Sequence, residues 1–430
     1  MKLREFPKIG ESYYETRLEN GLKLRVIPKR GFAKKYAFLA VDFGSIDTRF
    51  TFGGKRYELP DGIAHYLEHK LFDMPDGNAT DVFARYGGSP NAFTSHEMTA
   101  YYVSCTEFFE ENLRTLVKMV MTPWFTEESV EKERGIIAQE IKMYSDSPHS
   151  RVGEELFRGL FSHHPARVPI AGSVESIEKI TAQMLYDCYE AFYRPCNMML
   201  CVAGDVDEMR VKQIVLEGCR PATTELPLRD YGAAETGIPA ESRICHQMEV
   251  SMPTFAIGFC CRPPVDCAQS MYREAVGDLA AEILMGESSE LYERLYSEGL
   301  IDADFSAGYE NVKDACLLSA GGDSKSPEKV LEAILTEAER MNREGFDTAL
   351  FERLKKSALG RRTRGLDSFQ SICYRSCAYE FEGTDYFDFP QVYAQIQPED
   401  VAAFLKDTVK REKAALSLII PKTKEDAYEL

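Results

Sequence analysis

The chain has 430 residues, of which 44% are hydrophobic and 28% charged, and its formal net charge at pH 7 is −18. This composition is typical of a soluble globular protein with two or more domains. The negative charge argues against nucleic acid as a partner, and no stretch approaches the length of a membrane span.

The twelve cysteines are scattered and form no C-x-x-C pair. This pattern indicates neither a thiolate zinc site nor a redox motif. The first residues carry acid and proline where a signal peptide needs an apolar run. We therefore expect mostly buried, reduced thiols in a cytoplasmic protein.

The first elements expected along the chain are strands. Residues 22–28 alternate between apolar and polar side chains, and residues 36–45 form a more buried run. A helical pattern follows at residues 59–72, with apolar side chains at every fourth position. These side chains are Ile63, Leu67 and Leu71. Asp61 is expected to cap this helix.

Two histidines of this helix, His65 and His69, are four residues apart and project together, one turn from each other. Two imidazoles in this arrangement can bind one Zn²⁺. Glu68 stands beside the ion without having to bind it, which is the position of a general base for the attacking water. The order H-x-x-E-H is the inverzincin signature. The alternative is an exposed helix face that carries these residues by chance.

A long helix is predicted from Thr126, and it carries Glu133 and Glu140 two turns apart on one face. Ile137 lies between them, so the carboxylates border an apolar stripe, where an unpaired charge is unfavourable. A metal ion or its immediate surroundings would supply the missing partner. A solvated helix face is the alternative.

Shorter elements surround these two helices. We expect a helix near residues 81–86, strands at 91–95 and 98–104, a helix near 181–193 and a closing strand at 198–205.

The second half of the chain repeats the order of elements of the first half, although it has no second H-x-x-E-H motif. The sequence therefore predicts an α+β fold of two similar, duplicated domains, each a mostly antiparallel sheet covered by helices. The domains are predicted at residues 1–219 and 244–430, joined by a linker at 220–243 that is rich in proline, glycine and alanine. The elements expected in the second half are strands at 255–261, 317–321 and 415–421 and helices at 272–285, 327–342, 347–366 and 398–410.

With these residues in view, the chain resembles the pitrilysin/insulinase family of zinc metallopeptidases. Its size is closest to the processing-peptidase branch, which has one duplicated unit per chain. The resemblance covers most of the first half. The motifs that carry it are His65-x-x-Glu68-His69, Asn91-Ala92-x-Thr94, Glu133-x6-Glu140, Gly172 with Glu175-Ser176-Ile177, and Pro195-x-Asn197-Met198 to Gly204-Asp205.

The resemblance implies one Zn²⁺ per chain, bound by His65, His69 and Glu140, with a fourth position open for water. It also implies that Glu68 is the catalytic base and that Glu133 orients a ligand without binding the metal itself.

Substrate contacts follow from the same resemblance. Asn91 and Ala92 resemble edge-strand residues that pair with an extended peptide. Arg294 resembles an arginine of the second half that reaches over the substrate. The tyrosine that accompanies it in many members is absent, and Tyr296 and Tyr309 are substitutes whose simpler role is packing.

The function that the sequence favours is a zinc-dependent endopeptidase acting on peptides or small unfolded or precursor polypeptides. The alternative is a peptide-binding or partner subunit of a heteromeric peptidase with little activity of its own, a kind of chain that usually loses the metal motif. The resemblance also implies a homodimer, or a heterodimer with a related, inactive chain, that encloses the substrate in a chamber.

Overall fold

The computed structural model describes residues 1–221, 224–264, 266 and 269–422. Residues 222–223 of the predicted linker and Cys267 lie outside this range. The other cysteines are free, and most of them are buried. The chain forms two compact units, each built from three segments. Unit 1 comprises Met1–Ile141, Pro169–Tyr231 and Arg362–Phe387, and unit 2 comprises Lys142–Val168, Gly232–Arg361 and the residues from Asp388 onward.

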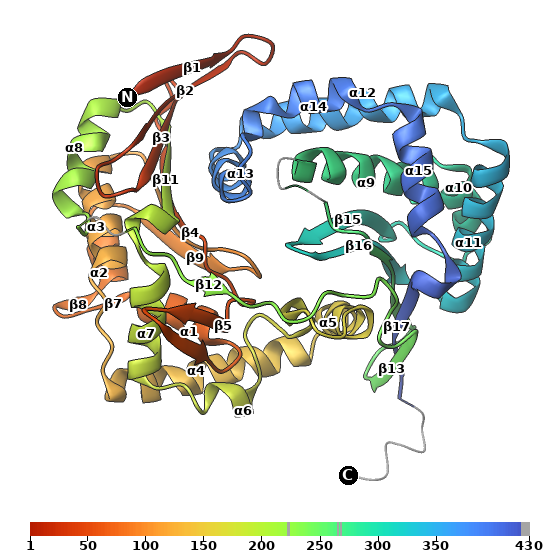
Figure 1. Ribbon diagram of the computed structural model, residues 1–430, viewed down its shortest axis with the longest axis horizontal. Coiled ribbons are helices and arrows are strands. Elements are labelled where there is room, and N and C mark those ends of the chain that lie inside the picture. The colour runs from red at the N-terminus through yellow and green to blue at the C-terminus, as the bar shows by residue number, and fades with distance from the viewer. Residues whose placement is uncertain (222–223, 265, 267–268, 423–430) are drawn as a thin grey trace. The chain divides into compact units, whose positions relative to one another are not determined.

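The core of unit 1 is a seven-stranded sheet in the order β1-β2-β3-β11-β4-β10-β9 (Figure 1). β3 and β11 are parallel, and the other neighbours are antiparallel. The strands are β1 (Lys2–Phe6), β2 (Glu11–Arg17), β3 (Lys23–Pro28), β4 (Lys35–Val41), β9 (Ser89–Thr94), β10 (Thr99–Cys105) and β11 (Met198–Gly204). Two small sheets are added, β12-β5-β6 (Leu228–Arg229, Arg49–Phe52, Lys55–Glu58) and β7-β8 (Asp73–Met74, Gly77–Asn78).

Helices cover both faces of this sheet. They are α1 (Ile63–Lys70), α2 (Ala79–Arg85), α3 (Phe109–Met121), α6 (Val174–Ile177), α7 (Ala182–Phe192), α8 (Glu208–Gly218) and α13 (Phe369–Phe381), with most of α4 (Glu127–Ser145). Alternate residues of β4 point to opposite faces. Ala37 and Leu39 belong to the hydrophobic core shared with α1 and α3, whereas Phe38 is buried on the face toward α13.

Unit 2 contains a five-stranded sheet in the order β13-β17-β14-β16-β15, in which only β13 and β17 are parallel among the described strands. Its strands are β13 (Arg243–Met248), β14 (Thr254–Cys261), β15 (Ser306–Val312), β16 (Ala315–Asp323) and β17 (Ala414–Pro421). Its helices are α5 (Pro148–Leu160), α9 (Ser270–Met285), α10 (Glu290–Ser297), α11 (Pro327–Glu344), α14 (Phe389–Gln395) and α15 (Pro398–Thr408), with most of α12 (Thr348–Gly365).

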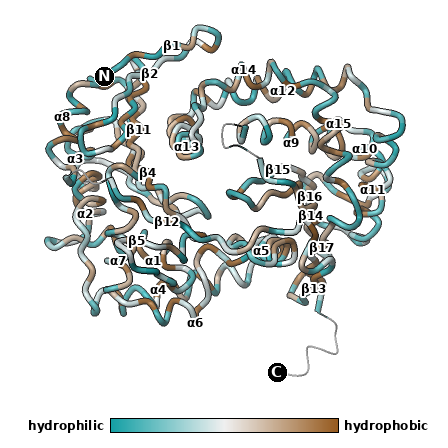
Figure 2. Tube along the Cα trace, in the orientation of Figure 1, coloured by the Kyte–Doolittle hydropathy of each residue, from teal (hydrophilic) through white to brown (hydrophobic). Residues whose placement is uncertain are grey.

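The two sheets share one topology. β3, β11, β4, β10 and β9 correspond in order and direction to β13, β17, β14, β16 and β15. The predicted α+β fold of two similar units is therefore confirmed. Figure 2 shows hydrophobic residues along the central strands of both sheets, as expected for strands covered on both faces.

Each unit takes one helix from the other half of the sequence. α13 follows α12 in the second half but packs on β11 and β4 of unit 1, and α5 follows α4 in the first half but packs on β14 and β17 of unit 2. The compact units thus differ from the contiguous ranges 1–219 and 244–430. The apolar faces of α13 and α5 are buried against these sheets, and this burial decides to which unit each helix belongs.

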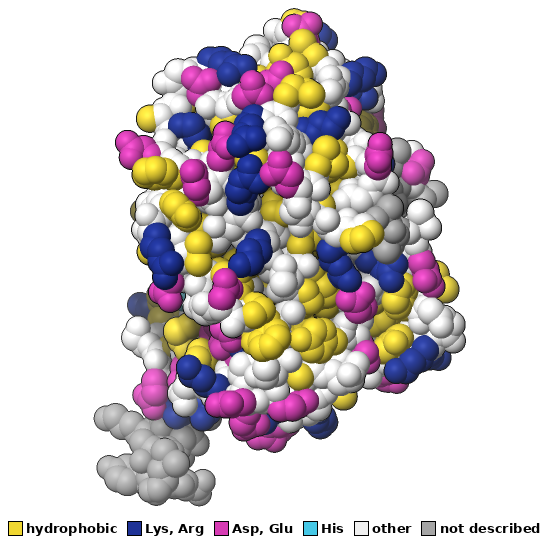
Figure 3. Space-filling model, turned by 90° about the vertical axis from the view of Figure 1, so that its left-hand side faces the viewer, with side chains coloured by type: hydrophobic (Ala, Val, Ile, Leu, Met, Phe, Trp, Pro, Cys, Tyr) yellow, Lys and Arg dark blue, Asp and Glu magenta, His cyan; other side chains and the backbone are white. Residues whose placement is uncertain are grey.

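No helix in the described part of the chain combines the length and apolar character needed to cross a membrane. The face drawn in Figure 3 mixes acidic, basic and hydrophobic side chains, and its described residues form no large field of one charge.

Candidate metal centre

Helix α1 begins at a glycine. Gly62 is the N-cap residue and has φ of 87°, in the left-handed region that favours glycine. A Cβ atom at this position would lie 2.3 Å from the carbonyl oxygen of Ala171. The predicted cap at Asp61 is wrong, because the helix begins one residue later and has no side-chain cap.

The apolar side of α1 packs into the core of unit 1. The predicted stripe is buried at all three positions, Ile63, Leu67 and Leu71. Tyr66 is also buried, and its hydroxyl donates a hydrogen bond to the carbonyl of Val130 in α4. These contacts fix α1 against α4.

Helix α4 presents its two glutamates to the histidines of α1. Its core-facing residues are Val130, Ile137 and Ile141. The side chains of Glu133 and Glu140 lie beside this stripe and are 18% and 23% exposed. The predicted shared face of the two glutamates is confirmed.

The donor atoms of His65, His69 and Glu140 converge, all within 4.8 Å of one another. Nε2 of His65 lies 3.6 Å from Oε1 of Glu140, and Nε2 of His69 lies 3.3 Å from Oε2 of Glu140. Tetrahedral ligands about 2.1 Å from Zn²⁺ are separated by about 3.4 Å. The two distances from imidazole to carboxylate are close to this value, and three protein ligands would leave one coordination position open.

Glu133 fixes the orientation of His69. Nδ1 of His69 lies 3.0 Å from Oε1 of Glu133, so the Nδ1–H group donates there while Nε2 is directed toward Glu140. Burial alone would lower the pKa of His69. The hydrogen bond to Glu133 and the charges of Glu68 and Glu140 outweigh burial and raise this pKa. The site is thus electrostatically suited to a positive charge.

Lys70, which no sequence pattern predicted, lies beside Glu133. Its side chain is 1% exposed, and the ammonium group lies 3.9 Å from Oε2 of Glu133 and 2.5 Å from Oδ2 of Asp73. It also donates to the carbonyl of Ser129 at 3.1 Å. The one sequence signal for this contact was that Lys70 directly follows the H-x-x-E-H motif. Its partners Glu133, Asp73 and Ser129 lie outside α1.

Glu68 is 8% exposed, and burial raises its pKa despite the opposing effects of His65 and His69. The hydroxyl of Thr94, at the end of β9, donates to Oε2 of Glu68 at 3.0 Å. Thr94 belongs to a motif that carries the family resemblance, but the sequence assigned it no role. Thr94 and Glu68 are 26 positions apart in the sequence, so helical or strand periodicity does not relate them.

Strand β9 has β10 as its one neighbour among the described strands, so its other edge is free. Ser95 N–H donates to the carbonyl of Met98 at 2.8 Å. From this pair onward, successive residues of β9 direct their backbone groups alternately toward β10 and away from it. This alternation directs the backbone N–H and C=O groups of Ala92 and Thr94 away from β10. Consistently, Ala92 N–H donates to Oδ1 of Asn91 at 2.8 Å.

The candidate residues of the second half lie in unit 2. Arg294 is in α10, with its guanidinium 3.9 Å from the Glu337 carboxylate. Tyr296 is exposed and stacks on Tyr292, whereas Tyr309 is buried.

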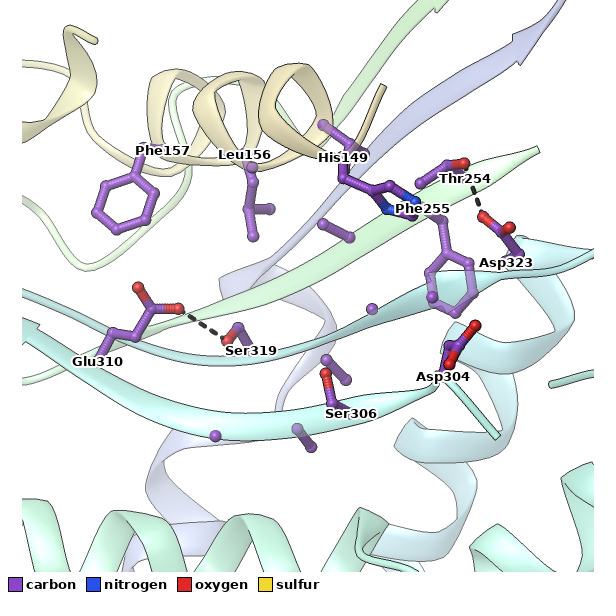
Figure 4. A pocket seen from close by; sticks show the side chains of 18 residues that line it. His149, Leu156, Phe157, Thr254, Phe255, Asp304, Ser306, Glu310, Ser319 and Asp323 are labelled. Carbon is purple, nitrogen blue, oxygen red and sulfur yellow. Dashed lines mark hydrogen bonds between the residues drawn. The ribbon is translucent and has the colours of Figure 1, made fainter. Parts of the chain in front are cut away.

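Unit 2 also contains a cavity of about 530 Å³ between α5 and the sheet (Figure 4). Leu156 and Phe157 of α5 line one side. On the opposite side, Ser319 donates to Glu310 at 3.1 Å.

Among the described residues, the one cluster suited to a metal is that of His65, His69 and Glu140 in unit 1.

Fold and site together define a duplicated α+β protein with a candidate H-x-x-E-H metal centre in its first unit. The family description "Insulinase (Peptidase family M16)" matches residues 51–174, and "Peptidase M16 inactive domain" matches residues 179–358. The chain belongs to this M16 family, the pitrilysin/insulinase peptidases.

Individual proteins are similar to this chain over almost its whole length. An uncharacterised zinc protease of Bacillus subtilis is 36% identical over 426 residues, which are 97% of this chain and 99% of the relative. The crystal structure of a protein described as an M16-like peptidase from Alicyclobacillus acidocaldarius has 32% identity and a TM-score of 0.92, covering 97% of this chain and 100% of that one. Pitrilysin shares the fold, with 19% identity and a TM-score of 0.75, over 97% of this chain and 46% of that one.

Proposed function

We propose that this chain is a zinc-dependent endopeptidase that hydrolyses peptides or small unfolded or precursor polypeptides. The observation that carries the proposal is the convergence of three zinc-type donors, with a buried carboxylate, that of Glu68, beside them on α1. A partner subunit without activity would not need to retain all four residues.

When bound, zinc supplies a Lewis acid that polarises the scissile carbonyl and makes water a better nucleophile at neutral pH. Glu68 accepts the proton of the attacking water and passes it to the leaving amine. His69 is kept in its ligating orientation by Glu133. The site would thus combine one base with a rigid set of ligands.

Substrate is proposed to bind as an added strand on the free edge of β9. The backbone groups of Ala92 and Thr94 would pair with the peptide, and the Asn91 side chain would have to release the N–H of Ala92. Arg294 is also proposed to contact the substrate. An extended peptide fits such an edge, whereas a folded protein does not.

We also propose that the active species is a homodimer, or a heterodimer with a related, inactive chain. In support, this chain matches 46% of the length of pitrilysin, so two such chains would together span most of that length. Sedimentation of the active species tests this assembly. The location is proposed to be cytoplasmic, which suits the free cysteines.

The proposal is tested by metal analysis and peptide cleavage in single variants. His65→Ala, His69→Ala and Glu140→Ala should each lose bound zinc and activity. Glu68→Gln should keep one zinc per chain and still bind peptide but lose turnover, because an amide cannot accept the proton. Cleavage at the parental rate by Glu68→Gln, or full zinc retention by Glu140→Ala, would contradict these roles.

A further inference from the structure

The hydrogen bond from Thr94 is the one that the Glu68 side chain makes within the described part of the chain. It occupies Oε2 and leaves Oε1 for the reacting water. A glutamate side chain has three rotatable bonds, so a buried carboxylate without a donor would sample several positions. The Thr94 hydroxyl therefore selects one position for Glu68.

Thr94 is itself held rigidly, because the turn that follows it is bonded to the loop after β4. Ser45 N–H donates to the carbonyl of Ser95 at 3.0 Å, and Ile46 N–H donates to the carbonyl of His96 at 3.1 Å. Gly44 allows this approach, since a Cβ atom there would lie 2.2 Å from the His96 carbonyl oxygen. The Thr94 hydroxyl, which donates to Glu68, is thus held in place by backbone hydrogen bonds of the turn that follows it.

The same residue belongs to the free edge of the sheet. Its backbone groups point away from β10, whereas its side chain points to α1 and Glu68. A peptide paired with β9 would thus bind to the residue that holds Glu68.

We propose that Thr94 is a positioning residue that ties the general base to the strand on which the substrate docks. Its hydroxyl fixes Glu68 so that the base faces the bond presented along β9. This inference rests on the proposed peptidase function, but it concerns the position of Glu68 and can be tested without turnover.

The kinetic test compares Thr94→Val, which removes the hydroxyl at constant shape, with Thr94→Ser, which keeps it. Thr94→Val should lower kcat about tenfold or more, since general bases contribute about 10²–10⁴-fold. KM and zinc content should stay near the parental values, and Thr94→Ser should recover most of kcat. Thr115→Val in α3 is the matched control, because it removes another buried threonine hydroxyl, bonded to the Glu111 carbonyl, and should leave kcat unchanged.

A double variant separates positioning from substrate contact. In the Glu68→Gln background, Thr94→Val should reduce neither the residual activity nor the affinity for an uncleaved peptide. Equal losses in both backgrounds, loss of zinc, or a parental kcat in Thr94→Val would overturn the inference.

Crystal structures of zinc-loaded parent and Thr94→Val protein decide the point even if the parent cleaves no peptide. The Glu68 carboxylate should leave its single position in the variant. An unmoved Glu68 would overturn the inference, whereas an inactive parent with a displaced Glu68 in the variant would contradict only the peptidase proposal.

Discussion

At the scale of single residues, the candidate metal centre contains three glutamates, each in different surroundings. Glu140 faces both imidazoles, Glu133 lies between His69 and Lys70, and Glu68 is buried against Thr94. These different neighbours suit the three glutamates to the roles proposed for them, those of ligand, orienting acceptor and base.

The orienting role proposed for Glu133 predicts a graded effect on metal affinity. Glu133→Gln keeps an acceptor for His69 but removes the charge, so zinc should still bind with about 10–100-fold lower affinity. Competition with a chelator of known affinity measures this change. Glu140→Gln is the comparison and should lose far more; equal affinities of the two variants would refute the distinction between ligand and orienting residue.

Asp61 gives a prediction about the pH dependence of stability. Burial raises its pKa, with Arg49 and Lys179 opposing, so the folded chain binds this proton more tightly than the unfolded chain does. The stabilising effect of this proton is complete below the ordinary aspartate pKa of 3.8 and is lost as pH rises through the higher folded value. Asp61→Asn should therefore raise the melting temperature at pH 7.

The gain from Asp61→Asn should shrink as the pH falls and vanish below about 3.8, where aspartate is protonated in both states. Thermal unfolding over a pH series measures it. A gain that is independent of pH would show that the effect does not arise from ionisation of Asp61.

At the scale of elements, the part of the site that sequence could predict is the part that is local. The i, i+4 histidines, the buried stripe of α1 and the shared face of Glu133 and Glu140 follow from helical periodicity alone. The contacts of Lys70 and Thr94 depend on how helices and strands pack, and no periodicity encodes them. The helix start was mispredicted because a left-handed glycine, rather than a capping side chain, begins α1.

The free edge of β9 predicts the effect of a backbone change. Pro90 already lies in this strand, at a position whose missing N–H would face away from β10. Ala92→Pro should likewise fold but remove a donor to the substrate, so KM should rise about tenfold or more with zinc retained. Ala92→Ser, which keeps the N–H, is the control. Parental KM in Ala92→Pro would exclude strand addition at this edge.

At the scale of the whole molecule, the duplication could be recognised from the repeated order of elements, but the exchange of helices could not. The sequence places α13 in the second half. Only its packing on β11 and β4, with residues such as Phe369 and Ile372 buried, reveals to which unit it belongs. Burying each such side chain stabilises a fold by roughly 1.5–3 kcal/mol. Neither half of the sequence therefore contains a complete unit.

This exchange predicts the behaviour of a chain cut between its halves. A protease site placed in the exposed residues 232–234 would give one fragment that carries α5 and another that carries α13. Because each fragment supplies a helix to the unit formed mainly by the other, the fragments should elute together in native size-exclusion chromatography and separate only in denaturant. A fragment of residues 1–231 expressed alone lacks α13 and should be poorly soluble. Separation of the nicked fragments under native conditions would show that the exchanged helices contribute little to holding the units intact.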